Sequence, residues 1–325
     1  MLGNHITAIG SAVYDIMFYA DNVLFIDNRQ DLLRQKLAAF EYGAKIYSDK
    51  VYLVNGGSGA NVATSFANLG LKTQIVCRLG LDFLGKDILA NIRAKKVSTK
   101  LIQFDHKHKT GLSFVANVGQ DNEHVIFAYR GANDYLDLNQ DKVNKINTSW
   151  IYLTSLPKNY IKQLDTLFHH VARKKIKLAW NPGAYQLQLP ANKLKDYLSK
   201  THVLVVNRDE ALEILAKHQV KNNIRDLIKN LHKFGQKITV ITDGQKGSYA
   251  FDGQELHFRP VKKVKALNTT GAGDSFGAGF VTGLIKYRDI KKGLALGTYN
   301  SAAVVSKIGA QTGLLCANDL KKYKL

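Results

Sequence analysis

Short apolar runs alternate with amphipathic helical patterns along most of this 325-residue sequence, and this alternation restricts the fold more than any other feature. Apolar runs of strand length lie at 6–16, 73–79, 150–154, 177–181, 202–207 and 238–242. Between them, apolar residues recur at three- and four-residue intervals, as one face of a helix requires, at 83–96, 158–174, 208–217 and 222–234. This order is typical of βαβ units, so we predict an α/β fold in which helices cover a mostly parallel sheet.

Residues 17–55 and 101–131 depart from this rhythm. The second region holds two stretches, L-S-F-V-A-N-V and H-V-I-F-A-Y-R, that alternate like antiparallel strands on either side of the polar turn G-Q-D-N-E. We therefore predict a small β-rich lid formed by parts of both regions. The polar run at 27–50 is compatible with a lid helix or with a flexible loop. No Pro-rich or low-complexity stretch divides the chain, so we expect residues 1–325 to form a single domain.

The chain is strongly basic, with 46 Lys and Arg residues against 26 Asp and Glu residues and a formal net charge of +20. The basic residues occur in short clusters, such as those at 173–177, 262–265 and 321–324, rather than in one arm. This distribution favours solvated lysines on helix faces over a nucleic-acid-binding surface. The same positive field would attract an anionic nucleotide.

Cysteine use and hydropathy indicate a reducing, aqueous compartment. The two cysteines, Cys77 and Cys316, lack the spacing of a disulfide framework or a metal site, and we expect both to be buried apolar residues. No apolar run is long enough to cross a bilayer, and the first residues show no signal-peptide pattern. We therefore expect a cytoplasmic protein that makes no membrane contact.

The segment N-T-T-G-A-G-D-S-F-G-A-G-F, residues 268–280, carries the clearest chemical signal. We expect it to follow a strand and to open a long apolar helix. The backbone N–H groups of Gly271, Ala272 and Gly273 would then form an anion-binding cradle at the helix N-terminus. Asp274, in the first turn, could accept the proton of an attacking hydroxyl group. Taken alone, the segment also has a purely structural interpretation. Asp274 would then only complement the helix dipole, and the glycines would only permit close helix packing.

This segment resembles the C-terminal signature of the ribokinase-like (PfkB) family of carbohydrate and nucleoside kinases. Near the N-terminus, G-G-S-G-A-N-V-A at 56–63, followed by A-N-L-G and R-L-G-L-D-F-L-G, is similar to the first signature of that family. Shorter matches follow in the expected order, namely T-G at 110–111, G-A-N at 131–133, N-P-G at 181–183, N-R-D-E at 207–210 and T-D-G-Q-K-G at 242–247. The resemblance spans nearly the whole chain and implies a ribokinase-like three-layer α/β/α domain with a small lid.

The resemblance also assigns residues to the acceptor. Asp15, expected at the end of the first strand, and Asn61 would bind acceptor hydroxyl groups. Gly56 and Gly57 would let the backbone approach the acceptor closely. From the local sequence alone, Asp15 could instead cap a turn, and Asn61 could instead cap the following helix.

A second group of residues is assigned to the nucleotide. These are Asn207 near the phosphate, Thr242, Gly244 and Gly247 along the nucleotide, and Asn300, Gly309 and Ala310 on the adenine side. Glu210 would help to place Mg²⁺, through water, as suits a hard cation that keeps much of its hydration shell. Read locally, Asn207 and Glu210 fit a capping box, and Asn300 fits a polar residue on a helix of small residues.

The chain departs from the family pattern at several positions. Asn268 stands where the family commonly has Asp, which leaves a monovalent-cation requirement in doubt. Ser58 replaces a Lys that is frequent in ribokinases, and the strand at 151–157 lacks the acidic residue expected for a ribose pocket, so ribose becomes a poorer candidate. The long stretch between Asp15 and Gly56 is similar to adenosine kinase-like members, and lid aromatics could stack on a base.

From these features we expect an ATP- and Mg²⁺-dependent phosphotransferase acting on a hydroxyl or hydroxymethyl group of a small sugar or nucleoside. The alternative is an adenosine kinase-like nucleoside kinase rather than a sugar kinase. Asp274 would be the base and residues 271–273 the anion hole. A homodimer through the lid is expected because antiparallel lid sheets expose edges. A non-catalytic nucleic-acid-binding relative remains as a rival because of the charge. A dinucleotide-dependent oxidoreductase is a remote alternative, since no glycine-rich dinucleotide-binding fingerprint follows the first strand.

Overall fold

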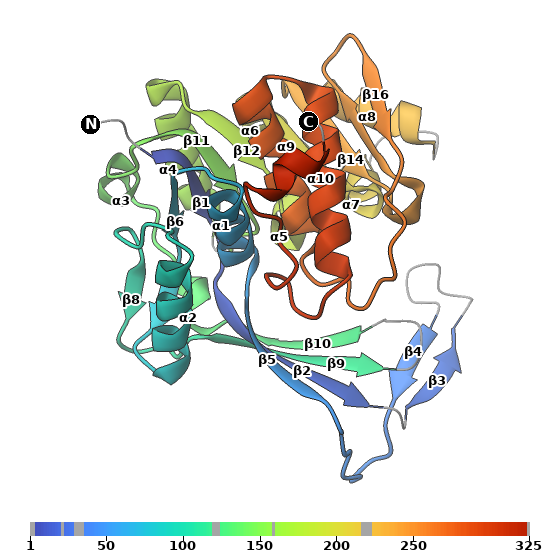
Figure 1. Cartoon of the computed structure of the whole chain (residues 1–325). Coiled ribbons are helices and arrows are strands. Elements are labelled where there is room, and N and C mark those ends of the chain that lie inside the picture. Colours follow the sequence, from blue (N-terminus) through green and yellow to red (C-terminus); the bar gives the residue numbers. More distant parts are fainter. Residues whose placement is uncertain are drawn as a thin grey trace.

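The computed structural model describes residues 4–20, 23–28, 36–118, 124–157, 160–215 and 223–323. Figure 1 shows a large α/β body from which a separate, smaller β-sheet extends. Within the described residues, the central sheet has eight strands. In spatial order they are β16 (Leu256–Arg259), β15 (Ser248–Phe251), β14 (Ile238–Thr242), β13 (Val203–Asn207), β12 (Lys177–Trp180), β11 (Thr148–Leu153), β1 (Asn4–Ile9) and β6 (Thr73–Val76).

The central sheet is mostly parallel, as predicted. The strands from β6 to β14 pair in parallel, and only β15 and β16 pair antiparallel at one edge. Strands buried on both faces need apolar side chains throughout, which explains the continuous apolar runs in the sequence. The carboxyl ends of these parallel strands all open on one side of the sheet, where ligands bind in open α/β folds.

Helices cover both faces of the sheet. On one face lie α3 (Gln140–Asn144), α4 (Ile161–Lys174), α5 (Ala184–Leu187), α6 (Ala191–Ser199), α7 (Arg208–Leu215) and α8 (Ile224–His232). On the other face lie α1 (Ser58–Asn68), α2 (Phe83–Ala94), α9 (Ala272–Tyr287) and α10 (Ile290–Val305). The 3-10 turns are η1 (Gly131–Tyr135), η2 (Gly244–Lys246) and η3 (Asp319–Tyr323). This three-layer arrangement confirms the predicted fold class.

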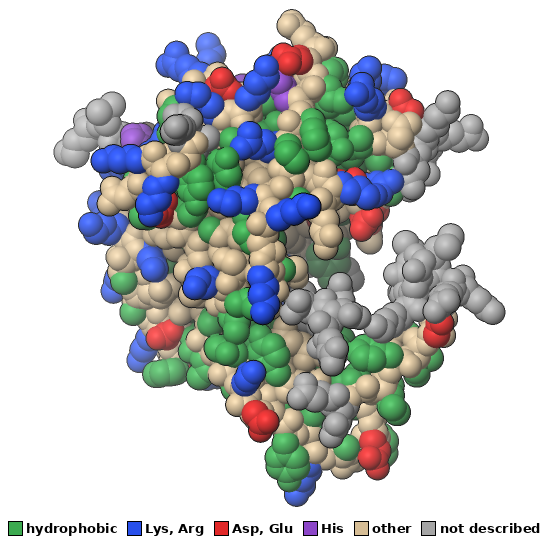
Figure 2. All heavy atoms as spheres, turned by 45° about the vertical axis from the view of Figure 1, so that its right-hand side comes forward, with side chains coloured by type: hydrophobic (Ala, Val, Ile, Leu, Met, Phe, Trp, Pro, Cys, Tyr) green, Lys and Arg blue, Asp and Glu red, His purple; other side chains and the backbone are tan. Residues whose placement is uncertain are grey.

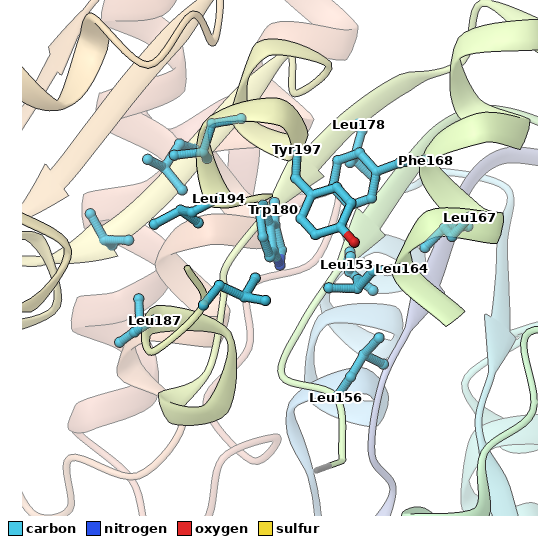
Figure 3. Close-up of a cluster of buried hydrophobic side chains, with 14 of the residues drawn as sticks. Leu153, Leu156, Leu164, Leu167, Phe168, Leu178, Trp180, Leu187, Leu194 and Tyr197 are labelled. Atoms are coloured by element: carbon cyan, nitrogen blue, oxygen red, sulfur yellow. The ribbon is translucent and has the colours of Figure 1, made fainter. Parts of the chain in front are cut away.

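Large apolar side chains fill the first of these two layers. Trp180 on β12 is fully buried and makes edge-to-face contacts with Phe168 of α4 and Tyr197 of α6. Figure 3 shows these rings surrounded by leucines from β11 and from the neighbouring helices. Burial of each such ring contributes several kcal/mol, about 3–5 by the cost of replacing it with Ala. The strands that carry the site are therefore held on a rigid base.

The lid is a four-stranded sheet in the order β10 (His124–Tyr129), β9 (Gly111–Val118), β2 (Val13–Ala20) and β5 (Val51–Gly56). Beside it, β3 (Leu24–Asp27) pairs antiparallel with β4 (Lys36–Ala39). A short parallel pair, β7 (Arg78–Gly80) and β8 (Gln103–Asp105), borders the body. The predicted antiparallel pairing of β9 with β10 is confirmed.

Three local predictions need correction. The apolar run at 6–16 is divided between the body strand β1 and the lid strand β2, and Asn133 holds the bend by bonding both the N–H and the C=O of Ala12 at 3.0 Å. The described part of 27–50 contains β4 and a turn rather than a helix. Residues 260–267 separate β16 from the 268–280 segment, so that segment does not follow a strand directly.

Cys77 is buried, as expected, and burial raises the pKa of its thiol to about 12. Cys316 is exposed instead, and its thiol donates a hydrogen bond to Asp319. Among the described residues, no helix combines the length and the apolar character that spanning a bilayer requires. Lys and Arg side chains are scattered over the visible surface rather than gathered in one patch (Figure 2).

Candidate active site

Asp274 lies in the first turn of α9, which begins after Gly271. Gly271 has a φ of 77°, and a Cβ there would lie 2.4 Å from the Cβ of Ala310, so only glycine permits this close turn. A Cβ on Gly273 would meet nothing within 4 Å. The start of α9 therefore has open space beside Gly273, although the N–H of Ala272 already donates to the carbonyl of Thr269 at 3.2 Å.

The Asp274 carboxylate is held by the neighbouring helix α1. The Nδ2 atom of Asn61 donates a hydrogen bond to Asp274 Oδ2 at 2.9 Å, and the Ser58 side chain bonds the same carboxyl group. Burial raises the pKa of Asp274 above its ordinary value, whereas these two hydrogen bonds lower it. A carboxylate with a raised pKa is a stronger base, which suits proton acceptance from an alcohol.

Asp15 faces the same space from the lid. It lies within β2 rather than at the end of the first strand, and it is only 5% exposed. Burial raises its pKa to about 6, a bond from Ser113 opposes this change, and the charge of Asp274 adds to it. A Cβ on Gly56 would lie 1.9 Å from Asp15 Oδ2, so this glycine makes room for the carboxyl group. The structure thus brings the two predicted acidic residues into electrostatic contact.

Gly57 begins α1 with a φ of 90°. A Cβ at this position would lie within 3 Å of the backbone of residues 11–13, at the bend between body and lid. Both predicted glycines, Gly56 and Gly57, therefore serve close packing where β5 enters α1.

Asn207 and Glu210 form the capping box that local sequence reasoning had favoured. The N–H of Glu210 donates to Asn207 Oδ1, and the N–H of Asn207 donates to Glu210 Oε2, both at 2.8 Å. Burial raises the pKa of Glu210, and the charges of Glu213, Asp209 and Asp274 raise it further. Glu210 is therefore a third carboxyl group within electrostatic reach of Asp274.

Thr242 ends β14 directly beside Asn207 at the end of β13. Gly244, with a φ of 49°, opens the following turn, and a Cβ there would meet nothing within 4 Å. Gly247 has a φ of 106°, and its Cβ would lie 2.3 Å from the carbonyl oxygen of Arg259. The predicted phosphate-side residues therefore lie together at the carboxyl ends of two neighbouring parallel strands.

Asn300 has a different role from the one assigned by resemblance. It is completely buried, and its Nδ2 atom donates to Ser65 Oγ and to the carbonyl of Ser275, while its Oδ1 atom accepts from the N–H of Leu315. It ties α10 to α1, α9 and the C-terminal segment, and its amide is enclosed by protein. By contrast, Thr298 and Tyr299 of the same helix line a pocket of about 550 Å³ together with residues 259–262.

Gly309 and Ala310 begin the segment that passes beneath the start of α9. Gly309 has a φ of 92°, and Ala310 is buried against Gly271. The next residue, Gln311, bonds Asn61 and was not identified from the sequence, because a single glutamine in a loop carries no periodicity or spacing signal.

The carboxyl groups of Asp15, Glu210 and Asp274 concentrate negative charge at one site, and such a concentration favours a bound cation. Among the described residues, no three His, Cys, Asp or Glu side chains are close enough together to enclose a metal ion.

The fold and the matching family model define a kinase of small molecules. Residues 5–316 match the family described as pfkB family carbohydrate kinase, and the chain belongs to this family. An ATP-dependent 6-phosphofructokinase from Thermoanaerobacterium thermosaccharolyticum is 26% identical over 318 residues, covering 93% of this chain and 96% of the relative.

Solved structures share the fold at lower identity. Arabidopsis thaliana ribokinase complexed with ribose and ATP superposes with a TM-score of 0.81 at 21% identity, covering 99% of this chain and 98% of that one. Burkholderia thailandensis nucleoside kinase in complex with inosine gives a TM-score of 0.79 at 15% identity, covering 98% and 97%. The ribokinase-like fold is thereby established.

Proposed function

We propose that this kinase transfers the γ-phosphoryl group of ATP to a hydroxyl or hydroxymethyl group of a small sugar, with Asp274 as the base. The observation that carries the proposal is the position of Asp274. Its carboxylate is desolvated, is held by Asn61 and Ser58, and lies in the first turn of a helix that has open space beside Gly273. A base and an anion-stabilising site are thus adjacent, as phosphoryl transfer requires.

The reaction follows from this arrangement. Asp15 and Asn61 bind hydroxyl groups of the acceptor, and the reacting hydroxyl group lies against Asp274. As the acceptor oxygen attacks the γ-phosphorus in line, its proton passes to Asp274 and the bond from the γ-phosphorus to the β-phosphate oxygen breaks. The N–H groups of residues 271–273 stabilise the charge on the transferred group. The products are the phosphorylated sugar and ADP.

The nucleotide lies along the carboxyl ends of β13 and β14. Asn207, Thr242, Gly244 and Gly247 border the phosphates, and Gly309 and Ala310 support the start of α9. The pocket beside Thr298 and Tyr299 is the better candidate for the adenine side, because Asn300 is completely buried. Glu210 would hold Mg²⁺ through water, and the bound ion would supply positive charge beside the phosphates. Asn268 is buried and its Oδ1 atom accepts the N–H of Thr270, so its amide stabilises the turn before α9.

A nucleoside acceptor is the second candidate. The segment between Asp15 and Gly56 adds the β3–β4 pair and several aromatic side chains to the lid, including Phe25 and Tyr47, which are 44% and 83% exposed. Exposed rings of this kind can stack on a base. A nucleoside keeps the sugar hydroxyl groups that Asp15 and Asn61 would bind, so the same catalytic residues serve either acceptor.

We also propose that two copies associate through the lid sheet. One face of this sheet is apolar across all four strands, because Leu53, Ile16, Phe114 and Phe127 pair in one row. Leu53 and Phe127 are 60% and 59% exposed. Exposed apolar patches of this extent mark association surfaces.

The test is ATP-to-ADP conversion with Mg²⁺ over a panel of pentoses, hexoses, sugar acids and nucleosides. We expect one acceptor to stimulate turnover strongly and Asp274→Asn to lower kcat by about 10²–10⁴-fold, while Asp141→Asn, an exposed control, has no effect. An Asp274→Asn protein with near-normal turnover would refute the role of the base. Tight, salt-sensitive nucleic-acid binding without phosphoryl transfer to any acceptor would favour a binding protein instead.

A further inference from the structure

Gln311 connects the candidate base to two helices through a chain of side-chain hydrogen bonds. Its Nε2 atom donates to Asn61 Oδ1 at 3.1 Å, and its Oε1 atom accepts from Asn91 Nδ2 of α2 at 3.1 Å. The hydroxyl group of Thr64, which is completely buried, donates to the same Oε1 at 3.4 Å. Asn61 then donates to Asp274 at 2.9 Å.

The direction of every bond in this chain follows from the charge on Asp274. An ionised carboxylate only accepts hydrogen bonds, so Asn61 must turn its Nδ2 toward Asp274 and its Oδ1 away. The atom that meets this Oδ1 must then be a donor, which fixes Nε2 of Gln311 on that side. The Oε1 of Gln311 consequently faces Asn91 and Thr64, both of which donate to it.

We propose that Gln311 is a positioning residue, which holds the Asn61 amide with its N–H toward Asp274. An asparagine amide turned by half a rotation would place its oxygen against the carboxylate, a repulsive contact that pushes the base out of position. This inference deepens the proposed function and rests on it for the role of Asp274.

The segment that carries Gln311 is itself held in place by contacts with β5, the start of α9 and Asn300. Gly309 lies against Val54 of β5, Ala310 lies against Gly271, and the N–H of Leu315 is held by Asn300. Gln311 therefore cannot move away without disturbing the start of α9. Asn61 is also the residue proposed to bind the acceptor, so one amide, oriented by Gln311, serves both base and substrate.

The test is a double-mutant cycle between Gln311→Met and Asn61→Ala. Met has a similar length but cannot donate, so we expect kcat to fall about tenfold in the wild-type background. In the Asn61→Ala background we expect Gln311→Met to change kcat less than about twofold, because the residue it orients is gone. Equal effects in both backgrounds would overturn the proposal. Gln254→Met, on the exposed β15–β16 turn, controls for the chemical change and should leave kcat unaltered.

A second readout does not depend on turnover. The Asp274 carboxyl group can be titrated by NMR with ¹³C-labelled aspartate and assigned with Asp274→Asn. We expect Gln311→Met to raise the midpoint, because Asn61 no longer donates continuously to the charged form. Asp15 on β2, Glu210 on α7 and Tyr152 on β11 also interact with Asp274 electrostatically, and they are the same in both proteins.

The two readouts separate failure of this inference from failure of the proposed function. If the titration midpoint of Asp274 is the same in Gln311→Met as in the wild type, the positioning role is refuted. This holds even if the wild type is active and Asp274→Asn is inactive, a result that would support the proposed function. If no acceptor in the panel is phosphorylated, the proposed function fails, and the titration still decides the role of Gln311. Should Gln311→Met not fold, Asn91→Ala removes the other end of the chain, and we expect a smaller midpoint change of the same sign.

Discussion

The Asp15 carboxyl group lies where its own charge is unfavourable. Burial and the neighbouring Asp274 raise its pKa in the folded protein to about 6, from an ordinary value of 3.8. Between these values the folded protein binds a proton that the unfolded chain does not, so stability falls as pH rises through this window. Above pH 6 the folded protein carries the full free-energy cost of the buried Asp15 charge. An acceptor hydroxyl group that donates to Asp15 would offset part of it, which links substrate binding to stability.

Asp15→Asn is accordingly expected to stabilise the free protein at pH 8, by up to about 3 kcal/mol from the size of the pKa difference. At pH 4 the gain should vanish, because Asp15 is then protonated in the folded state. Thermal melting of both proteins across this range is the measurement, with the exposed Asp141→Asn as control. The acceptor KM should rise at the same time. A melting temperature for Asp15→Asn below that of the wild type at pH 8 would contradict the account.

At the scale of elements, α9 uses its glycines for two purposes. A Cβ on Gly273 would enter open space at the N-terminus, whereas a Cβ on Gly277 would lie 1.9 Å from the hydroxyl oxygen of Tyr152. Tyr152 lies on β11 and is completely buried. The first glycine therefore leaves room for a ligand, and the second lets the helix approach the sheet.

The two alanine variants should separate these purposes. Gly273→Ala is expected to raise stability slightly, by about 0.5–1 kcal/mol, and yet to lower kcat, since its methyl group occupies the proposed phosphoryl site. Gly277→Ala is expected to cost about 1–3 kcal/mol through overpacking, and Tyr152→Phe should restore part of that loss. Denaturant unfolding and steady-state kinetics measure both quantities. Normal kcat in Gly273→Ala would argue against the anion cradle.

Elements with strong periodicity were predictable, and contacts between distant elements were not. The parallel strands and their covering helices follow from apolar spacing within each segment. The break between β1 and β2 depends on Asn133, which lies 121 residues from Ala12 in the sequence. The structural role of Asn300 and the link from Gln311 to Asn61 likewise depend on partners more than 200 residues away. The sequence and its family resemblance singled out Asp274 and Asn61, but not Gln311, which bonds Asn61.

At the scale of the whole molecule, the lid exposes more apolar surface than a monomer needs. Its outer row runs from Leu53 through Ile16 and Phe114 to Phe127. The +20 net charge opposes association of two bodies, so a contact confined to this apolar sheet face is the arrangement that keeps the basic surfaces apart. Because Asp15 precedes Ile16 on β2, association would also steady the acceptor side of the site.

The double variant Leu53→Lys/Phe127→Lys is expected to break this association, because four lysines would then meet across a two-fold interface. Sedimentation equilibrium should give a dimer mass for the wild type that falls to the monomer value on dilution, and a monomer mass for the variant at every concentration. Phe83→Lys, at a 77% exposed position on α2 outside the lid, is the matched control and should behave as wild type. A wild-type mass that stays at the monomer value at all concentrations would exclude the lid dimer. If Phe83→Lys dissociated the dimer while the lid variant did not, the interface would lie on the body instead.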